Sequence, residues 1–379
     1  MSEFSPGLEG VLAARTEISE VDGQNGRLIY RGGYLIQDLA ASCGFEEVAF
    51  LLLHGELPTA AELRSFRSDL AGRRELVPAA AAALQALPPE ADPMDVLRTA
   101  LSAQGAQPDL TRPSLEEAVG YVACLPTIVG AAYRRRQGEP PVAPHADLDQ
   151  AANLLYMMLG REATTDQLRW VDQYLLLLAD HGLNASTFTA RVVASTGSDL
   201  CSCLVGAVAA LKGPAHGGAA TGAMKMLEKI GSAQNAEPWL AAALDRHERL
   251  MGFGHRVYRT YDPRAKILRE TARSANPGLY ETARVTEEAA IRLLHERHPE
   301  RPNATNVDYW SSVVLAGAGI PKEFFTCVFA ISRVVGWSAH VLESMKDLRI
   351  IRPMSEWVGP PPTRKPVPIA DRGKAAARQ

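Results

Sequence analysis

The feature of this chain that most constrains its fold is the helical spacing of its apolar residues, which recurs along most of its 379 residues. Apolar side chains return every three or four positions, and this spacing places them on one face of a helix. The pattern occurs at 46–54, 78–87, 115–134, 151–160, 167–180, 186–196, 199–211, 219–230, 237–250, 263–273, 281–297, 306–317 and 322–346. We therefore predict a mostly α-helical protein.

A strand pattern is confined to the start of the chain. Two short runs, 16–21 and 27–30, contain β-branched and aromatic residues and flank the turn-rich segment 22–26. That segment combines Asp, Gly and Asn, which favour a tight turn between antiparallel strands. One small β-hairpin is therefore expected near the N-terminus.

Length and composition limit the class of protein. A chain of 379 residues is too long for one ordinary core, which predicts two domains or one large domain with a smaller one attached. No apolar run approaches the roughly 20 residues that cross a bilayer, and residues 1–6 lack the basic segment and apolar core of a secretory signal. We expect a soluble cytoplasmic protein that does not span a membrane.

Charge and cysteine content exclude further classes. A net charge of −3 gives no general attraction to nucleic acid. Five cysteines without a CxxC pair fit neither a disulfide framework nor a zinc ribbon. His295 and His298 lie in a charged run without a third ligand nearby, so we interpret them as solvated and expect no metal site. Any anionic ligand must be held by local basic clusters.

A polar segment, 180–188, separates two of the predicted helices. Gly182 is typical of a helix end, and Ser186 of a helix start. His181 next to this break has two interpretations. It interacts favourably with the end of the helix dipole, or its ring donates a hydrogen bond to a bound carboxylate.

A second histidine, His216, lies in GPAHGGA at 213–219, directly before a predicted helix. The positive end of the helix dipole disfavours a protonated ring, so His216 is expected to be neutral. A neutral imidazole still donates a hydrogen bond to a developing enolate oxygen. The alternative is a simple turn histidine, although the glycines that follow allow a ligand to approach closely.

A basic cluster follows in the segments MGFGHRVYR at 251–259 and DPRAK at 262–266. Asp262 and Pro263 are typical of a helix N-cap and first turn, which places Arg264 just inside a helix. Arginines gathered in this way hold phosphates or carboxylates, whereas the alternative is a solvated basic face. The pattern GxGHRV differs from the dinucleotide-binding GxGxxG.

Three further candidates lie near the C-terminal end. Asp308 falls in the first turn of a helix that begins in NATNVDYW at 303–310, where the helix dipole favours an ionised carboxylate. Such a residue is either a dipole-complementing carboxylate or a general base. Arg333 lies within an amphipathic stretch, and Arg352 precedes a proline. Each alone is typical of a surface arginine.

Taken together, HGLNASTFTARV at 181–192, GPAHGGA at 213–219, GFGHRVY at 252–258 with DPRA at 262–265, and NVDYW at 306–310 resemble the citrate synthase family. These motifs occur in that family's order. The similarity extends to 7–11 and 31–33 near the start and to 332–333 and 352–353 near the end. It therefore covers nearly the whole chain.

The resemblance implies a fold and an assembly. A large helical domain, 1–217 with 321–379, and a small helical domain, 218–320, are expected to close over a cleft between them. Arg352 is expected to reach across into the site of a second subunit. A homodimer follows from that implication.

The resemblance also implies a reaction of the tricarboxylic acid cycle, in which acetyl-CoA condenses with oxaloacetate and the thioester is hydrolysed to citrate and CoA. His216 would bind the thioester oxygen, Asp308 would remove a methyl proton, and His255 would polarise the ketone. An aspartate is a weak base and needs the enolate stabilised as it forms, so these roles depend on one another.

The substrate-binding residues follow from the same resemblance. Four residues are expected to bind the carboxylates of oxaloacetate: His181, Arg264, Arg333 and Arg352. Six are expected near CoA, the arginines at its phosphates and the others at its adenine: Arg256, Arg259, Met251, Gly252, Phe253 and Gly254. CoA is a cosubstrate, and no tightly bound cofactor is implied.

The sequence departs from the family's usual pattern in two places. Trp310-Ser311-Ser312 stands where Tyr-Ser-Gly is more familiar, and Met354 stands where arginine is common after Arg352-Pro353. Trp310 is therefore a candidate for shaping the space around the acyl group. One alternative is a 2-methylcitrate synthase that uses propionyl-CoA, and another is a noncatalytic protein that binds CoA or citrate.

Overall fold

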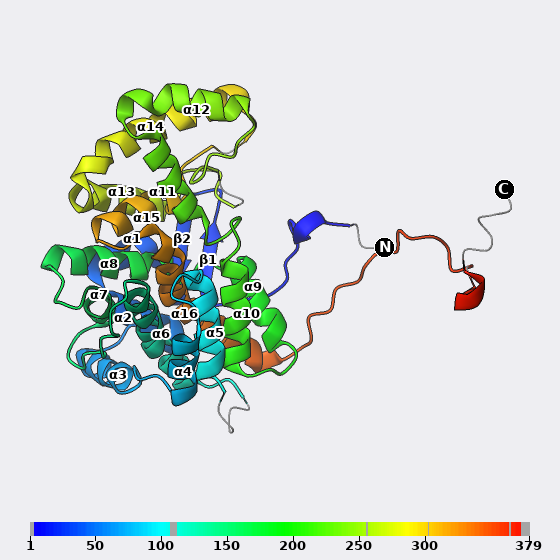
Figure 1. Ribbon diagram of the computed structural model, residues 1–379, viewed down its shortest axis with the longest axis horizontal. Helices are drawn as coiled ribbons and strands as arrows, with labels where there is room; N and C mark the ends of the chain where they lie inside the picture. Colours follow the sequence, from blue (N-terminus) through cyan, green and yellow to red (C-terminus); the bar gives the residue numbers. More distant parts are fainter. Residues whose placement is uncertain (1–3, 107–111, 255–256, 302, 364, 373–379) are drawn as a thin grey trace.

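The computed structural model describes residues 4–106, 112–254, 257–301, 303–363 and 365–372 (Figure 1). Within these residues the chain forms sixteen α-helices and one three-stranded sheet, which confirms the mostly helical fold. The helices are α1 (Ile36–Ser42), α2 (Phe45–His54), α3 (Ala60–Gly72), α4 (Pro78–Ala86), α5 (Pro93–Gln104), α6 (Leu115–Arg136), α7 (Gln150–Leu159), α8 (Thr165–Leu178), α9 (Ala185–Ala194), α10 (Leu200–Leu211), α11 (Ala219–Ile230), α12 (Ala236–Asp245), α13 (Pro263–Ala275), α14 (Pro277–Arg297), α15 (Val307–Gly317) and α16 (Phe325–Ser344).

Side chains at the helix starts define many of these boundaries. Thr59, Ser114 and Thr164 each accept a hydrogen bond from the backbone three residues later, at the starts of α3, α6 and α8. In each case the Glu or Gln side chain at that later position accepts a hydrogen bond from the backbone N–H of the capping residue. Two otherwise unpaired backbone donors are thereby satisfied. At the starts of α9 and α13, the side chains of Asn184 and Asp262 accept hydrogen bonds from backbone N–H groups without the second, reciprocal bond.

The predicted hairpin is present and pairs antiparallel strands β1 (Ser19–Asp22) and β2 (Arg27–Tyr30). Its turn is held by Asp22, which accepts hydrogen bonds from the backbone of Asn25 at 3.0 Å and from Arg27 at 2.8 Å. A two-residue strand, β3 (Tyr34–Leu35), adds to β2 and was not predicted. Its brevity leaves no alternation that a sequence pattern can detect.

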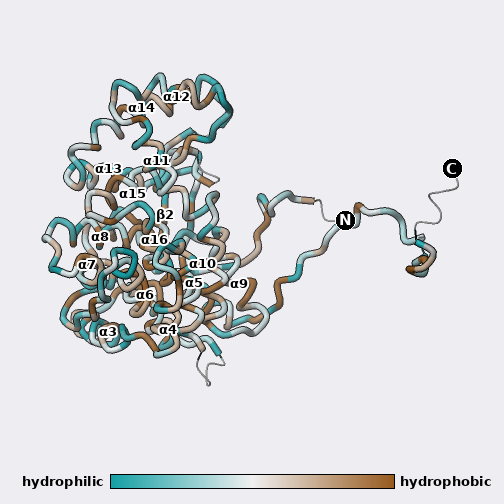
Figure 2. Tube along the Cα trace, viewed as in Figure 1, coloured by the Kyte–Doolittle hydropathy of each residue, from teal (hydrophilic) through white to brown (hydrophobic). Residues whose placement is uncertain are grey.

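Helix α16 runs through the centre of the protein. Every residue from Phe325 to Val341 is buried, and α16 packs against α2, α5, α6, α8, α9 and α10. The expectation that no apolar run approaches the length needed to cross a membrane is wrong for stretches 115–136 and 322–347, which are long and apolar enough. However, 78% and 94% of their apolar windows are buried inside the protein. Their apolar surfaces therefore form the core, where Figure 2 shows hydrophobic segments gathered.

Helices α11 to α15 form one end of the molecule, at the top of Figure 1. Within this end α13 and α11 pack on α15, and α12 packs on α14. Helices α13 and α15 also pack on α8, and α11 packs on α16. Gln167, near the start of α8, donates a hydrogen bond to the Ala318 carbonyl at the end of α15 at 2.9 Å.

Both chain ends extend away from the helical body (Figure 1). These segments carry large apolar side chains in solvent, including Leu12, which is 97% exposed, and Met354, which is 93% exposed. Trp357 is 76% exposed. Isolated apolar residues on a surface are ordinary, but here several of them lie on the extended terminal segments.

Candidate active site

The loop at 252–254 pairs with the segment that leads into α15. Gly252 accepts a hydrogen bond from the Asn306 N–H at 3.0 Å, and the Gly254 N–H donates to Ala304 at 2.9 Å. Gly252 has φ +90°, and a Cβ there would lie 2.7 Å from the side chain of Tyr309. Only glycine therefore permits this close approach. His255 and Arg256, which follow the loop, lie outside the described residues.

Asp308 occupies the first turn of α15, as predicted, and its N–H donates to Asn306 Oδ1 at 3.1 Å. The position at a helix start favours an ionised carboxylate, but burial of Asp308 opposes that effect. Burial raises the pKa of Asp308 to about 7, even though the charge of Arg264 lowers it. The carboxylate therefore gains a proton affinity close to that required of a general base at neutral pH.

Arg264 lies in the first turn of α13, where Asp262 is the N-cap as predicted. Asp262 accepts from the Arg264 backbone N–H at 3.0 Å and from its Nε and Nη2 at 3.1 and 2.8 Å. Both side chains are buried, with 3% and 0% of their surfaces exposed. Asp262 therefore fixes the guanidinium and compensates its charge.

Arg333 lies on α16 and is 1% exposed. Its Nε donates to the Leu178 carbonyl at 2.7 Å, and its guanidinium lies 4.7 Å from the centre of the Phe329 ring. Within the part of the chain that the structure describes, no carboxylate forms an ion pair with Arg333. Burial lowers the pKa of Arg333 to about 10, although the negative charge of Asp180 raises it in part.

His216 lies before α11, and its Nε2 is 2.8 Å from Ser186 Oγ. Trp337 Nε1 donates to the same hydroxyl at 3.0 Å, which anchors it from the side of α16. Burial and the charge of Arg333 lower the pKa of His216 to about 4. The ring is neutral near pH 7, as expected, although the helix dipole is not the principal reason.

His181 lies in the turn between α8 and α9. Its Nε2 is 3.3 Å from Tyr258 Oη, and only 9% of the residue is exposed. Gly182 has φ +56° and donates its N–H to Asp180 Oδ2 at 2.8 Å, which shapes the turn. Asn184 then starts α9 by accepting from two backbone N–H groups.

Arg333 is the common neighbour of these groups. Its charge lowers the pKa of His216 and of Asp308, and the charge of Arg264 acts on both Asp308 and Arg333. The structure thus brings four predicted residues to one buried region between α8, α11, α13, α15 and α16. That region contains a neutral donor, a weakly acidic carboxylate and two buried cations.

Arg352 and Arg259 are among the predicted residues that are not part of this cluster. Arg352 is exposed on the extended C-terminal segment, and Arg259 is exposed beyond the loop that follows Gly254. Sequence reasoning also missed Ser186 as a partner of His216. The sequence places Ser186 two residues after the Asn184 cap, but it gives no signal for the contact with His216, which lies 30 residues away along the chain.

Residues 7–354 match the family model described as "Citrate synthase, C-terminal domain". The chain belongs to the citrate synthase family. A citrate synthase of Deinococcus radiodurans is 40% identical, covering 95% of this chain and 97% of that protein. A 2-methylcitrate synthase of Mycobacterium tuberculosis is also 40% identical, covering 94% and 91%.

A solved structure of the citrate synthase family has nearly the same fold. The ternary complex of Thermoplasma acidophilum citrate synthase with carboxymethyl coenzyme A and oxaloacetate superposes with a TM-score of 0.93 at 35% identity. The match covers 98% of this chain and all of the other. Citrate synthase family members are acyltransferases, so this chain is an enzyme of that class.

Trp310 departs from the family's usual residue, but its side chain points away from the cluster. Its Nε1 donates to Glu287 Oε1 at 2.8 Å, and its ring packs against Tyr280 and below Arg269. Residues two apart on a helix do not face each other, so Trp310 and Asp308 occupy different faces of α15. The prediction that Trp310 shapes the acyl space is not supported by this placement.

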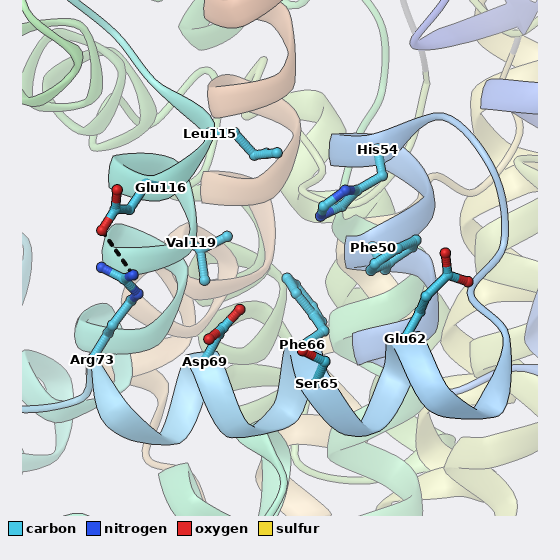
Figure 3. Close-up of a pocket in the computed structure, with 10 residues that line it drawn as sticks. All are labelled: Phe50, His54, Glu62, Ser65, Phe66, Asp69, Arg73, Leu115, Glu116 and Val119. Carbon is cyan, nitrogen blue, oxygen red and sulfur yellow. Dashed lines mark hydrogen bonds and ion pairs between the residues drawn. The ribbon is translucent and has the colours of Figure 1, made fainter.

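A groove of about 490 Å³ lies elsewhere, between α2, α3 and the start of α6 (Figure 3). The rings of Phe50 and His54 stack at 3.9 Å, and Phe66 meets Phe50 edge-on at 5.5 Å. An ion pair between Arg73 and Glu116 at 2.9 Å closes one end. No predicted site residue lines the groove, so it is separate from the candidate active site.

Proposed function

We propose that this chain is a citrate synthase, which condenses acetyl-CoA with oxaloacetate and hydrolyses the thioester to citrate and CoA. The observation that carries the proposal is the buried Arg333 guanidinium, which has no ion-pair partner among the described residues and lies beside His216 and Asp308. A buried cation without an ion-pair partner in direct contact favours an anionic ligand, because the charge of Asp180 offsets the burial of Arg333 only in part. Oxaloacetate supplies two carboxylates.

The carbon chemistry rests on Asp308 and His216. Asp308 takes a proton from the acyl methyl group, and the neutral His216 ring donates a hydrogen bond to the thioester oxygen as negative charge develops there. The new enolate then attacks the ketone carbon of oxaloacetate, which His255 polarises. A base with a pKa of about 7 suits this step because it is both ionised and basic near neutral pH.

His181, Arg264 and Arg333 hold the carboxylates of oxaloacetate in this proposal. Burial of these residues supports it, because hydrogen bonds to charged groups are strongest where water is excluded. Arg264 is already fixed by Asp262 and needs no reorganisation to bind an anion. Preorganised donors lose less entropy when the ligand binds.

The CoA moiety is assigned to the loop beside α15. Arg256 and Arg259 bind its phosphates, and Met251 to Gly254 lie at its adenine. The exposure of Arg259 supports this assignment, since CoA phosphates remain in contact with solvent. CoA is a substrate in this reaction and not a resident cofactor.

We assign 1–217 with 321–379 to a large domain and 218–320 to a small domain that closes on it. A homodimer is proposed in which Arg352 reaches oxaloacetate in the partner. The exposed apolar residues of the terminal segments support an assembly that covers them. Cytoplasmic location and a place in the tricarboxylic acid cycle are also proposed. Five free cysteines are consistent with a reducing compartment.

The second candidate is 2-methylcitrate synthase, which the 40% identity to the Mycobacterium tuberculosis enzyme favours equally. Propionyl-CoA differs from acetyl-CoA by one methylene, and a pocket discriminates such a difference by about 1–3 kcal/mol. Measured kcat/KM for both thioesters with oxaloacetate separates the candidates. A higher value for acetyl-CoA supports citrate synthase, and a higher value for propionyl-CoA overturns it.

A protein that binds CoA or citrate without catalysis is the remaining alternative. The intact His216, His255 and Asp308 argue against it. Oxaloacetate binding without thiol release from either thioester would support it.

A further inference from the structure

A buried histidine that the proposed chemistry does not use lies behind the oxaloacetate residues. His340 on α16 is fully buried, and its Nε2 is 3.3 Å from Asp180 Oδ1. On the other side of the ring, Arg191 Nη1 donates to His340 Nδ1 at 3.1 Å. Arg191 is itself paired with Glu343 at 2.7 Å. His340 therefore connects α9 to the end of α8 through the central helix.

These contacts determine where the ring carries its proton. A guanidinium only donates hydrogen bonds, so His340 Nδ1 accepts from Arg191. The ring proton then lies on Nε2, on the side of Asp180. Among the described residues, Asp180 Oδ1 and His340 Nε2 form no hydrogen bond with any third group, and the 3.3 Å ion-pair contact joins them to each other. Each atom depends on the other in a region without water access.

Asp180 in turn shapes the turn that carries His181. Its Oδ2 accepts from the Gly182 N–H at 2.8 Å and from the Ser19 hydroxyl, so these two groups hold the backbone on both sides of His181. Gly336 on α16 makes room for this carboxylate, because a Cβ there would lie 2.4 Å from Asp180 Oδ1. The shape of the turn therefore depends on where α16 holds Asp180.

The same carboxylate acts on Arg333. The negative charge of Asp180 raises the pKa of Arg333, partly offsetting the effect of burial. Burial would raise the pKa of Asp180 itself, but His340, Arg333 and Ser19 together lower it. One ionised carboxylate thus serves both the His181 turn and the Arg333 cation, and His340 keeps it in place.

We infer that His340 is a positioning residue for oxaloacetate: through its Nε2–H it orients Asp180, which holds the His181 turn and compensates Arg333. This inference rests on the proposed function, since it assigns oxaloacetate to His181 and Arg333. His340 does not touch the substrate. Its removal acts on substrate binding through Asp180.

Two substitutions of His340 test separately its contact with Asp180 and its contact with Arg191. The amide nitrogen of glutamine occupies the place of Nε2, so His340→Gln keeps a donor toward Asp180. The amide oxygen of asparagine occupies the place of Nδ1, so His340→Asn keeps only the acceptor for Arg191. Ser338→Ala on the same helix is the matched control, because Ser338 is buried and its hydroxyl has no partner among the described residues.

The KM values for oxaloacetate and acyl-CoA, kcat and Tm are measured for each variant, and oxaloacetate binding by calorimetry. We expect His340→Asn to raise the oxaloacetate KM at least about tenfold, equivalent to about 1.4 kcal/mol, with little change in kcat or the acyl-CoA KM. His340→Gln and Ser338→Ala are expected to retain the original oxaloacetate KM.

Equal effects of His340→Asn and His340→Gln on the oxaloacetate KM would overturn the inference. So would variants that lower Tm but leave this KM unchanged, because His340 would then serve stability alone. Should either variant fail to fold, Ser19→Ala provides a second test, because it removes another partner of Asp180 at the hairpin. Failure of the unmutated protein to bind oxaloacetate would refute the proposed function instead.

Discussion

The substitution Asp308→Asn is expected to make the protein more stable at pH 8 while removing its activity. An amide has nearly the shape of the carboxylate but carries no charge, so burying it costs less. The asparagine variant cannot accept the methyl proton, and turnover should fall by several orders of magnitude. Oxaloacetate binding should be retained, because other side chains hold its carboxylates.

The size of the stabilisation follows from the pKa of Asp308. Because the folded value of about 7 exceeds the ordinary 3.8, the folded state binds the proton more tightly, and stability falls as pH rises between these values. This difference corresponds to about 4 kcal/mol at about 1.4 kcal/mol per pH unit. Because Asp308 is only partly buried, solvent screening reduces the expected gain to about 2–4 kcal/mol.

Calorimetry from pH 5 to pH 8 tests this expectation. With an unfolding entropy of about 2.1 cal/mol/K per residue over 379 residues, the gain corresponds to a Tm increase of about 3–5 °C at pH 8. The increase should shrink toward pH 5, where Asp308 in the original protein is protonated. Asp166→Asn is the matched control, since Asp166 also lies in the first turn of a helix but is exposed.

A Tm difference that is the same at pH 5 and pH 8 would refute the reasoning, because it would not depend on the ionisation of Asp308. A lower Tm at pH 8 would show that the ionised carboxylate is stabilised by its surroundings. Retained turnover in Asp308→Asn would remove Asp308 from the role of base.

Three further outcomes are expected. Plots of kcat/KM against pH should rise about tenfold per pH unit below about 7 and level off above it, because Asp308 must be ionised; a flat profile would contradict this. Gly23→Ala should lower Tm and raise KM for both substrates, because a Cβ at this position would lie 2.1 Å from the Val257 carbonyl oxygen of the facing loop. Gly72→Ala is the control and should change neither quantity, because a Cβ at Gly72 would meet open space. Trp310→Phe should lower the free energy of unfolding by about 1–3 kcal/mol by removing the donor to Glu287, without changing the ratio of kcat/KM for acetyl-CoA and propionyl-CoA. A changed ratio would restore Trp310 to the acyl pocket.

Local signals explain which parts of the fold the sequence predicted. Thirteen of the sixteen helices show the apolar spacing, but α1, α3 and α5 were missed. Helix α3 buries only Phe66 and Leu70, so its apolar face is too narrow for that pattern. Its start was nevertheless marked by Thr59 and Glu62, and that of α5 by Asp92 before a proline. Helix α1 is only seven residues long.

The candidate site was predictable where its residues lie in short motifs. His216, Asp308 and Arg264 are each next to glycines or capping residues that identify a turn or helix start. Their environment was not predictable, because burial and long-range charges determine it. Burial raises the pKa of Asp308, whereas the charges of Arg264 on α13 and Arg333 on α16 lower it, and none of these effects is visible in the local sequence. Asp180 and His340 are 160 positions apart in the sequence.

The most direct test of the proposed function is release of free CoA thiol when the purified protein is mixed with oxaloacetate and acetyl-CoA or propionyl-CoA. We predict release with both thioesters and a clearly higher kcat/KM for acetyl-CoA, with citrate as the product. A higher value for propionyl-CoA would identify a 2-methylcitrate synthase. No release with either thioester would contradict the assigned roles of His216 and Asp308.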